Sequence, residues 1–190
     1  MTQARASKQT ASAVQKAPVK LGRFPDAKHD HAKCVTAALH HAESLCKERG
    51  ARLTDIRRQV FELVWQSHAP VGAYDVLEGL NQRERKAQPP TVYRALEFLM
   101  DQGLIHRIES LNAYIGCAQP GDAHTGQFLI CRDCGATAEL IDSAIDAAIG
   151  RGAEAAGFAI EHPTVELEGV CARCRTATRG GKRKGSARRG

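Results

Sequence analysis

Two pairs of cysteines constrain the fold of this chain more than any other feature of its sequence. Cys131 and Cys134 are separated by two residues, and so are Cys171 and Cys174. Four thiolates in two such pairs suit the tetrahedral coordination of Zn²⁺ and leave no open position for catalysis. A metal held by both pairs would join the two ends of one small domain. The pattern therefore predicts a structural zinc site that contributes to the folding free energy of that domain.

Thiol redox chemistry is the competing interpretation of the cysteine pairs, because a CxxC pair can also act as a reactive dithiol. Two pairs in one short segment favour structural zinc over that alternative. No run of the chain approaches eighteen apolar residues, and the first twenty residues lack the continuous apolar stretch of a secretory signal. We therefore expect a cytoplasmic protein with reduced thiols and no membrane partner.

The positive charge of the chain is concentrated at its two ends. The formal net charge is +6, yet residues 31–174 contain more acidic than basic residues. Both ends are basic, rich in small residues and poor in large apolar ones. We expect them to be disordered over residues 1–30 and 176–190, because they cannot bury enough apolar surface to fold. Such tails favour a polyanionic partner, although they also serve simply to keep a chain in solution.

Residues 31–117 show the periodicity of a helical domain that ends in a hairpin. Apolar residues recur at steps of three and four, as in helices with one buried face. Helices are expected over residues 32–49, after the N-cap Thr54, after Gly72 with Tyr74, Leu77 and Leu80 inward, and from Pro89-Pro90 to Gly103. Two β-prone segments follow at residues 104–109 and 113–117. Helices followed by a hairpin are typical of winged-helix DNA-binding domains, in which one helix enters the major groove.

The fourth predicted helix offers polar side chains at its N-terminal end, the end that reaches bases in helix-turn-helix proteins. Arginine commonly reads guanine, tyrosine can contact a phosphate or a thymine methyl group, and other arginines can hold phosphates. The candidate DNA-binding residues are Thr91, Tyr93, Arg94, Arg52 and Arg57. The alternative is that they are ordinary solvated residues of a helical bundle, because acidic and basic residues balance over residues 50–117.

Residues 126–175 are expected to form a small α/β domain after a hinge at residues 118–125. The predicted strands cover residues 128–131, 137–141, 158–160 and 165–167, with a helix from Asp142 to Gly157 after the second strand. A core of this size needs help from a metal or a partner subunit. The expected fold class is α/β (α+β), with an N-terminal winged-helix DNA-binding domain and a small α/β dimerisation domain that carries the four-cysteine zinc site.

A second set of metal-binding residue types lies on both sides of the predicted hinge. Its members are His106, Cys117, His124 and Glu139. A mixed set of nitrogen, sulfur and carboxylate donors suits Zn²⁺. Each residue taken alone also has an ordinary structural explanation. Whether a further site is formed from His29, Asp30, His31, Cys34 or His162 stays open.

At these motifs the sequence resembles the ferric-uptake-regulator family, and within it the zinc-uptake regulator branch. The matching segments are residues 52–57, 73–77, 89–99, 103–106 and 114–117, together with both cysteine pairs. The resemblance covers about residues 32–174, which is all but the tails. Two departures stand out. Gln88 occupies a position where a lysine commonly precedes the two prolines, and His124 alone remains of a histidine-rich run that is typical of iron sensors.

The resemblance implies a homodimeric repressor, not an enzyme, that binds double-stranded operator DNA when zinc is loaded. It assigns two Zn²⁺ ions to each subunit, a structural ion at the four paired cysteines and a regulatory ion at His106, Cys117, His124 and Glu139. It also places Tyr93 and Arg94 on the recognition helix. The alternatives are a sensor of another metal or of peroxide, a thiol redox protein, and a protein that coats nucleic acid through its tails. Whether dimers pair side by side on DNA stays open.

Overall fold

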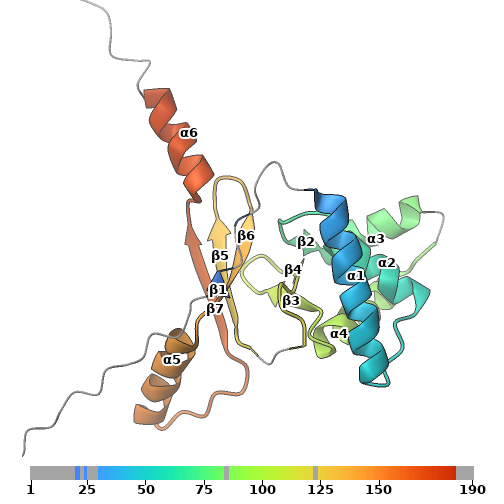
Figure 1. The fold of residues 1–190 in the computed structure, drawn as a ribbon, viewed down its shortest axis with the longest axis horizontal. Helices are drawn as coiled ribbons and strands as arrows, with labels where there is room; N and C mark the ends of the chain where they lie inside the picture. Colours follow the sequence, from blue (N-terminus) through green and yellow to red (C-terminus); the bar gives the residue numbers. More distant parts are fainter. Residues whose placement is uncertain (1–19, 22–23, 25–29, 84–85, 122–123, 183–190) are drawn as a thin grey trace, which may run out of the picture.

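The computed structural model describes residues 20–21, 24, 30–83, 86–121 and 124–182, which form two lobes side by side (Figure 1). The first lobe contains four helices and a three-stranded sheet. Its helices are α1 (His31–Glu48), α2 (Asp55–Val64), α3 (Ala73–Gln82) and α4 (Pro89–Asp101). Its strands are β2 (Val71–Gly72), β3 (Ile105–Ile108) and β4 (Ala113–Gly116), in the order β2-β4-β3. The four predicted helices and the predicted hairpin are therefore confirmed.

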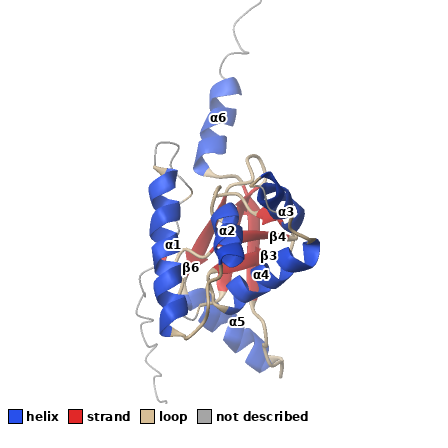
Figure 2. Ribbon diagram, turned by 90° about the vertical axis from the view of Figure 1, so that its right-hand side faces the viewer, coloured by secondary structure: helices blue, strands red, loops and turns tan. Residues whose placement is uncertain are grey.

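Local signals explain where the helices of the first lobe begin and end. Asp30 caps α1, because its side chain accepts a hydrogen bond from the backbone N–H of Lys33. Two prolines open α4, where their missing N–H groups cost no helical hydrogen bond. Gly103 follows α4 with a φ of +63°, a conformation that favours glycine after a helix. Seen from the side of this lobe, α2, α3 and α4 lie in front of the strands (Figure 2).

The inner face of α3 differs from the predicted one. Tyr74 was expected to point inward, but it is 72% exposed, whereas Val76 and Leu80 are fully buried. Ala73 and Leu77 also pack against the core. The buried stripe therefore follows the i, i+3, i+4, i+7 pattern that starts at Ala73, and this register leaves Tyr74 outside it.

Trp65 and Gly116 pack tightly between α2 and the hairpin. A Cβ atom added at Gly116 would lie 2.2 Å from the Trp65 ring. We expect Gly116→Ala to destabilise this lobe by about 1–3 kcal/mol, because the ring has to move out of its packed position. Trp65 is the one tryptophan of the chain, so its fluorescence during urea unfolding reports this loss directly. Gly152→Ala is the control, because a Cβ atom there meets nothing within 4 Å. An unchanged unfolding midpoint in Gly116→Ala would contradict the expectation.

The second lobe is a four-stranded sheet with one helix at each end. Its strands are β1 (Lys20–Leu21), β5 (Gly126–Cys131), β6 (Thr137–Ile141) and β7 (Thr164–Gly169), in the order β1-β6-β5-β7. The strands β5 and β6 form an antiparallel hairpin, and β7 pairs with β5 in parallel. Helices α5 (Ser143–Ala155) and α6 (Ala172–Lys182) lie at opposite ends of the sheet (Figure 1). The described part of the chain contains no helix that is long and apolar enough to span a membrane.

Two predictions about this lobe are wrong in part. Residues 158–160 form no strand, whereas the strand predicted at residues 165–167 is present as β7 and pairs with β5. The segments expected to be disordered also contribute elements, since β1 pairs with Leu140 and Ile141, and α6 runs to Lys182. Backbone pairing with a free sheet edge needs no apolar side chains, so composition gave no sign of β1. Residues 1–19, 22–23, 25–29 and 183–190 lie outside the described residues.

Several large apolar side chains of the second lobe are exposed in the part of the chain that the structure describes. No residue of α5 is buried. Phe158 is 66% exposed and Leu167 is 48% exposed, and Ile160 is exposed as well. Large apolar side chains that are exposed together commonly mark an interaction surface.

Candidate functional site

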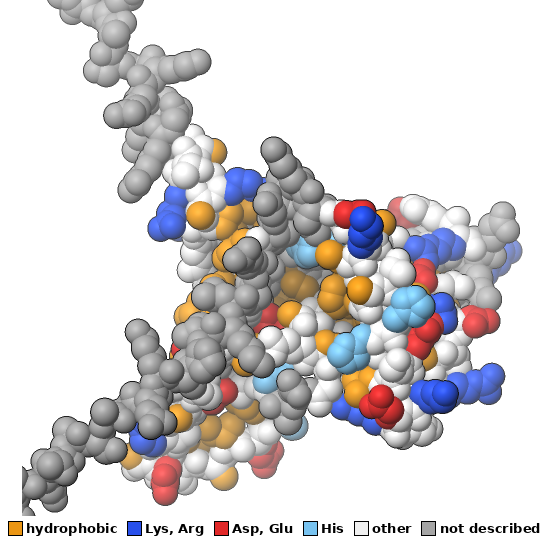
Figure 3. All heavy atoms as spheres, viewed as in Figure 1, with side chains coloured by type: hydrophobic (Ala, Val, Ile, Leu, Met, Phe, Trp, Pro, Cys, Tyr) orange, Lys and Arg blue, Asp and Glu red, His pale blue; other side chains and the backbone are white. Residues whose placement is uncertain are grey.

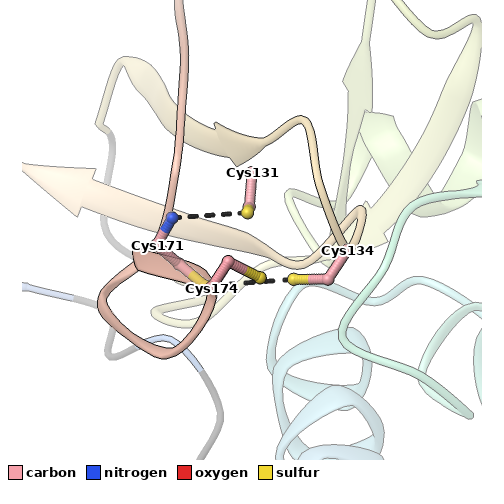
Figure 4. A group of neighbouring side chains, drawn as sticks. All are labelled: Cys131, Cys134, Cys171 and Cys174. Atoms are coloured by element: carbon pink, nitrogen blue, oxygen red, sulfur yellow. Dashed lines mark hydrogen bonds between the residues drawn. The ribbon is translucent and has the colours of Figure 1, made fainter. Parts of the chain in front are cut away.

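The four paired cysteines meet at one end of the second lobe (Figure 4). Cys131 is the last residue of β5 and Cys134 follows in the adjoining turn, while Cys171 directly precedes α6 and Cys174 lies in its first turn. The sulfur atoms of these four cysteines all lie within 4.8 Å of one another. The parallel pairing of β5 and β7 explains this meeting, because the carboxyl ends of parallel strands lie at the same edge of a sheet.

The environment of the sulfurs separates their proton affinities. The backbone N–H of Cys171 lies 3.3 Å from the Cys131 sulfur and is the main cause that lowers the pKa of Cys131 to about 6. The backbone N–H of Ala136 lowers the pKa of Cys134. Hydrogen bonding to Cys171 and Cys134 raises the pKa of Cys174 to about 12. Clustered thiolates repel one another unless a cation compensates their charge, and four soft sulfur donors fit Zn²⁺.

The second donor cluster lies between the lobes. His106 belongs to β3 and Cys117 follows β4, whereas Glu139 belongs to β6, and His124 comes from the segment that links the lobes. One donor atom from each of these residues lies within 4.8 Å of the others. Cys117 is fully buried and Glu139 is 6% exposed. The structure therefore brings together all four residues that the sequence suggested.

The geometry of this mixed cluster centres on one carboxylate. Glu139 Oε1 lies 2.7 Å from His124 Nε2 and 2.9 Å from His106 Nε2. The other oxygen, Oε2, accepts a hydrogen bond of 2.9 Å from the backbone N–H of Ala118. The Cys117 sulfur lies 3.6 Å from His124 Nε2. Two imidazole nitrogens, a thiol and a carboxylate that converge in this way fit Zn²⁺.

Glu139 is held in its ionised form. Burial raises the pKa of this carboxyl. The hydrogen bond and charge of His106 and the N–H of Ala118 together lower the pKa by more, so the net shift is downward. The His106 ring also makes an edge contact with the ring of Phe128, at 5.3 Å between centroids. The hydrogen bond to Ala118 and the contact with Phe128 orient two of the donors, as supporting groups do in metal sites.

The structure places the candidate DNA-binding residues in two groups. Thr91, Tyr93 and Arg94 are exposed at the N-terminal end of α4, and their side chains make no hydrogen bond within the described part of the chain. Arg52 is exposed as well. Arg57 differs, because its guanidinium donates to the carbonyl of Arg52 and lies 3.5 Å from the centroid of the Phe98 ring. This arginine braces α2 against α4. Acidic and basic side chains are interspersed on the face seen in Figure 3.

The remaining metal-capable residues form no comparable cluster. The rings of His31 and His68 are 4.6 Å apart, Cys34 is half-buried and His162 is exposed. His29 lies outside the described residues. Among the residues that the structure describes, only the two clusters above bring three or more metal-binding groups together.

Sequence reasoning missed one polar residue between the lobes. The carboxylate of Glu166 in β7 accepts hydrogen bonds from the backbone of the β3–β4 turn. No local pattern indicates a contact between segments so far apart in the sequence. The one signal is a charged residue in the middle of a strand, and that is common at exposed positions.

The fold and the two donor clusters define a two-lobed winged-helix protein equipped to bind metal. The sequence model of the ferric uptake regulator family matches residues 48–168. The chain is 40% identical over 139 residues to the zinc uptake regulation protein of Escherichia coli (strain K12), covering 72% of this chain and 80% of that protein. It is 28% identical over 130 residues to the zinc uptake regulation protein of Mycobacterium tuberculosis (strain ATCC 25618 / H37Rv), covering 67% of this chain and 97% of that protein.

Two solved structures have the same arrangement. A zinc uptake regulator complexed with zinc and DNA is 37% identical and superposes with a TM-score of 0.73, covering 76% of this chain and 97% of that chain. The holo form of XcZur is 40% identical and superposes with a TM-score of 0.69, covering 74% of this chain and 98% of that chain. This chain belongs to the ferric uptake regulator family.

Proposed function

We propose that this protein is a zinc-responsive transcriptional repressor that binds operator DNA as a homodimer when zinc is loaded and controls zinc-uptake genes. The observation that carries the proposal is the cluster of His106, Cys117, His124 and Glu139 between the lobes. Relatives named zinc uptake regulation protein, and a similar structure described as complexed with zinc and DNA, support it. The proposed location is the cytoplasm.

The two donor clusters have different roles in this proposal. The four paired cysteines would hold a structural ion, because their site lies within one lobe and uses thiolates alone. His106, Cys117, His124 and Glu139 would hold a regulatory ion, which gives two ions per subunit. Zn²⁺ bound there would link donors of the two lobes and would offset the negative charges of Glu139 and of the Cys117 thiolate.

The chain's own residues convert occupancy of the mixed cluster into DNA binding. His106 and Cys117 fix the hairpin of the first lobe, while Glu139 is fixed in the sheet of the second lobe. Convergence of these donors therefore sets the angle between the lobes, and with it the direction of α4. A ligand shifts such an equilibrium only by its differential affinity, and a near-complete switch needs about 5.5 kcal/mol.

The uncovered apolar surface of the second lobe favours a second copy of the chain as partner. Phe158, Ile160 and Leu167 are exposed, Phe158 and Ile160 lie next to α5, and α5 has no buried residue. A two-fold dimer would present two α4 helices, and operator half-sites one helical turn apart would accept both. The angle between the lobes then decides whether both helices reach successive major grooves.

On DNA, we assign base contacts to Tyr93 and Arg94 and backbone contacts to Thr91 and Arg52. The exposure of all four side chains, three of them at the N-terminal end of α4, supports this assignment. Arg57 would act indirectly by holding α2 against α4. Arg94→Ala is expected to weaken operator binding by about 1–3 kcal/mol, which is about 5- to 150-fold, and to relax the preference at one base position.

Fluorescence anisotropy with a labelled operator measures this loss. Lys47→Ala is the matched control, because it removes the same charge from the same lobe. Lys47 lies near Arg49, whose guanidinium donates to the Gln102 carbonyl just after α4, at the helix end opposite Arg94. Equal losses in both variants would argue that Arg94 contributes only general charge.

A footprint on DNA next to the protein's own gene, with added zinc and with chelator, tests the proposed function. We expect one protected region of dyad symmetry that disappears with chelator. A thiol redox protein would protect no such region. Binding that vanishes when residues 1–19 and 183–190 are removed would instead support nucleic-acid coating through the tails, and would overturn the repressor proposal.

A further inference from the structure

Glu166 joins the two lobes outside both donor clusters. Its Oε1 accepts a hydrogen bond of 2.6 Å from the backbone N–H of Glu109, and its Oε2 accepts one of 3.1 Å from the N–H of Ser110. Both N–H groups belong to the turn between β3 and β4, the tip of the hairpin in the first lobe. Successive backbone N–H groups that point to one place form an anion-binding site, and the second lobe supplies the anion.

An apolar seam lies next to this contact. Ile108 and Ile115 of the hairpin pack against Phe128 and Ile130 of β5, and all four are buried. Phe128 is also the residue of β5 that stands opposite Glu166 in the parallel register with β7. The hairpin is therefore held against the second lobe by the donor cluster through His106, by the seam, and by the Glu166 carboxylate at the turn.

The Glu166 side chain is not needed to build its own strand. The backbone of β7 pairs with β5 over six residues from Thr164 to Gly169, independently of the side chains. Burial raises the pKa of Glu166, but the hydrogen bonds from Ser110 and Glu109 lower it by more, so the carboxylate is ionised at neutral pH. Hydrogen bonds to a charged acceptor are stronger than neutral ones.

We infer that Glu166 is a positioning residue for DNA reading, because its carboxylate fixes the tip of the hairpin against the second lobe. The inference rests on the proposed function. Separation of the lobes would return the carboxylate and both N–H groups to water, so the contact favours the closed arrangement. The same arrangement assembles the cluster of His106, Cys117, His124 and Glu139. By linkage, a residue that favours closure raises the affinity of that cluster for zinc without touching the metal.

Glu166→Gln tests the inference in the full-length protein. Glutamine keeps the shape of the side chain but has one acceptor oxygen and no charge. Hydrogen exchange at the N–H groups of Glu109 and Ser110 should become about tenfold faster in the zinc-loaded protein. The zinc affinity of the mixed cluster, measured by chelator competition, and the operator affinity at saturating zinc should each fall by about three- to tenfold. The four-cysteine site should keep its zinc, and Trp65 fluorescence should not change.

Glu168→Gln is the matched control. Glu168 lies two residues later on the same face of β7 and carries the same charge, and its side chain makes no hydrogen bond among the described residues. It should behave as the wild type in every measurement. If Glu166→Gln matches the wild type while the wild type responds to zinc, the positioning role is overturned and the proposed function stands. If zinc does not change the operator affinity of the wild type, the proposed function fails. Hydrogen exchange at the N–H groups of Glu109 and Ser110 then tests only whether the contact with Glu166 exists.

Discussion

A Cys117→Ser variant is expected to lose zinc-dependent operator binding while it remains folded and dimeric. Cys117 is the one sulfur donor of the mixed cluster, it is fully buried, and it lies just after the hairpin of the first lobe. A serine hydroxyl is a poor ligand for Zn²⁺ in place of a thiolate. The operator affinity in the presence of zinc should therefore fall on the order of a hundredfold or more, towards that of the zinc-free wild type.

Anisotropy titrations at fixed free zinc measure this change, and zinc analysis should show one ion per chain instead of two. Cys34→Ser is the matched control, because Cys34 is a half-buried cysteine of α1 outside both clusters. The control should bind the operator as the wild type does. A Cys117→Ser protein that still responds fully to zinc would show that the mixed cluster is not the regulatory site.

Cys131→Ser is expected to disrupt the second lobe itself. Cys131 is buried at the end of β5, and its sulfur accepts the backbone N–H of Cys171 across the site. Structural zinc contributes about 10–16 kcal/mol in small zinc-dependent domains, which is as large as the whole usual stability of a domain, about 5–15 kcal/mol. Loss of one of four thiolates should therefore abolish cooperative folding of this lobe, and with it dimerisation and operator binding.

Size-exclusion chromatography, limited proteolysis and circular dichroism report on the second lobe, while Trp65 fluorescence reports on the first. We expect a protease-sensitive second lobe with unchanged Trp65 emission. Cys117→Ser serves here as the contrasting variant, because it removes one thiolate from the other cluster. Equal loss of folding in both variants would contradict the division into a structural and a regulatory site.

The sequence predicted the helices and the hairpin because these features depend on local order, and it predicted both donor sets because their residue types stand out. Apolar spacing determines α1 to α4, and Pro89 and Gly103 mark the ends of α4. The cysteine pairs are informative because two residues between ligands suit one tetrahedral ion. For the mixed cluster, residue types at the junction suggested a set that the fold does bring together.

What the sequence did not predict depends on pairing between distant segments. The strands β1 and β2 have two residues each and exist only through their partners β6 and β4. Residues 158–160 are β-prone but pair with no strand, whereas the segment around residues 165–167 does pair with β5. The contact of Glu166 with the hairpin turn also spans two lobes. The β-propensity of a segment does not tell with which other segment it will pair.

The parallel pairing of β5 and β7 has a consequence for the order in which a newly synthesised molecule matures. The strand that completes the sheet and the second cysteine pair both come from residues 164–174, near the end of the chain. Residues 164–174 must therefore be synthesised before β7 can join the sheet of the second lobe. The helical lobe is complete some fifty residues earlier. Contacts of such long sequence separation form late. In the proposed repressor, the winged-helix lobe would therefore be complete on the ribosome before the sheet that pairs with a second copy, and zinc binding by the four cysteines would be the last step of assembly.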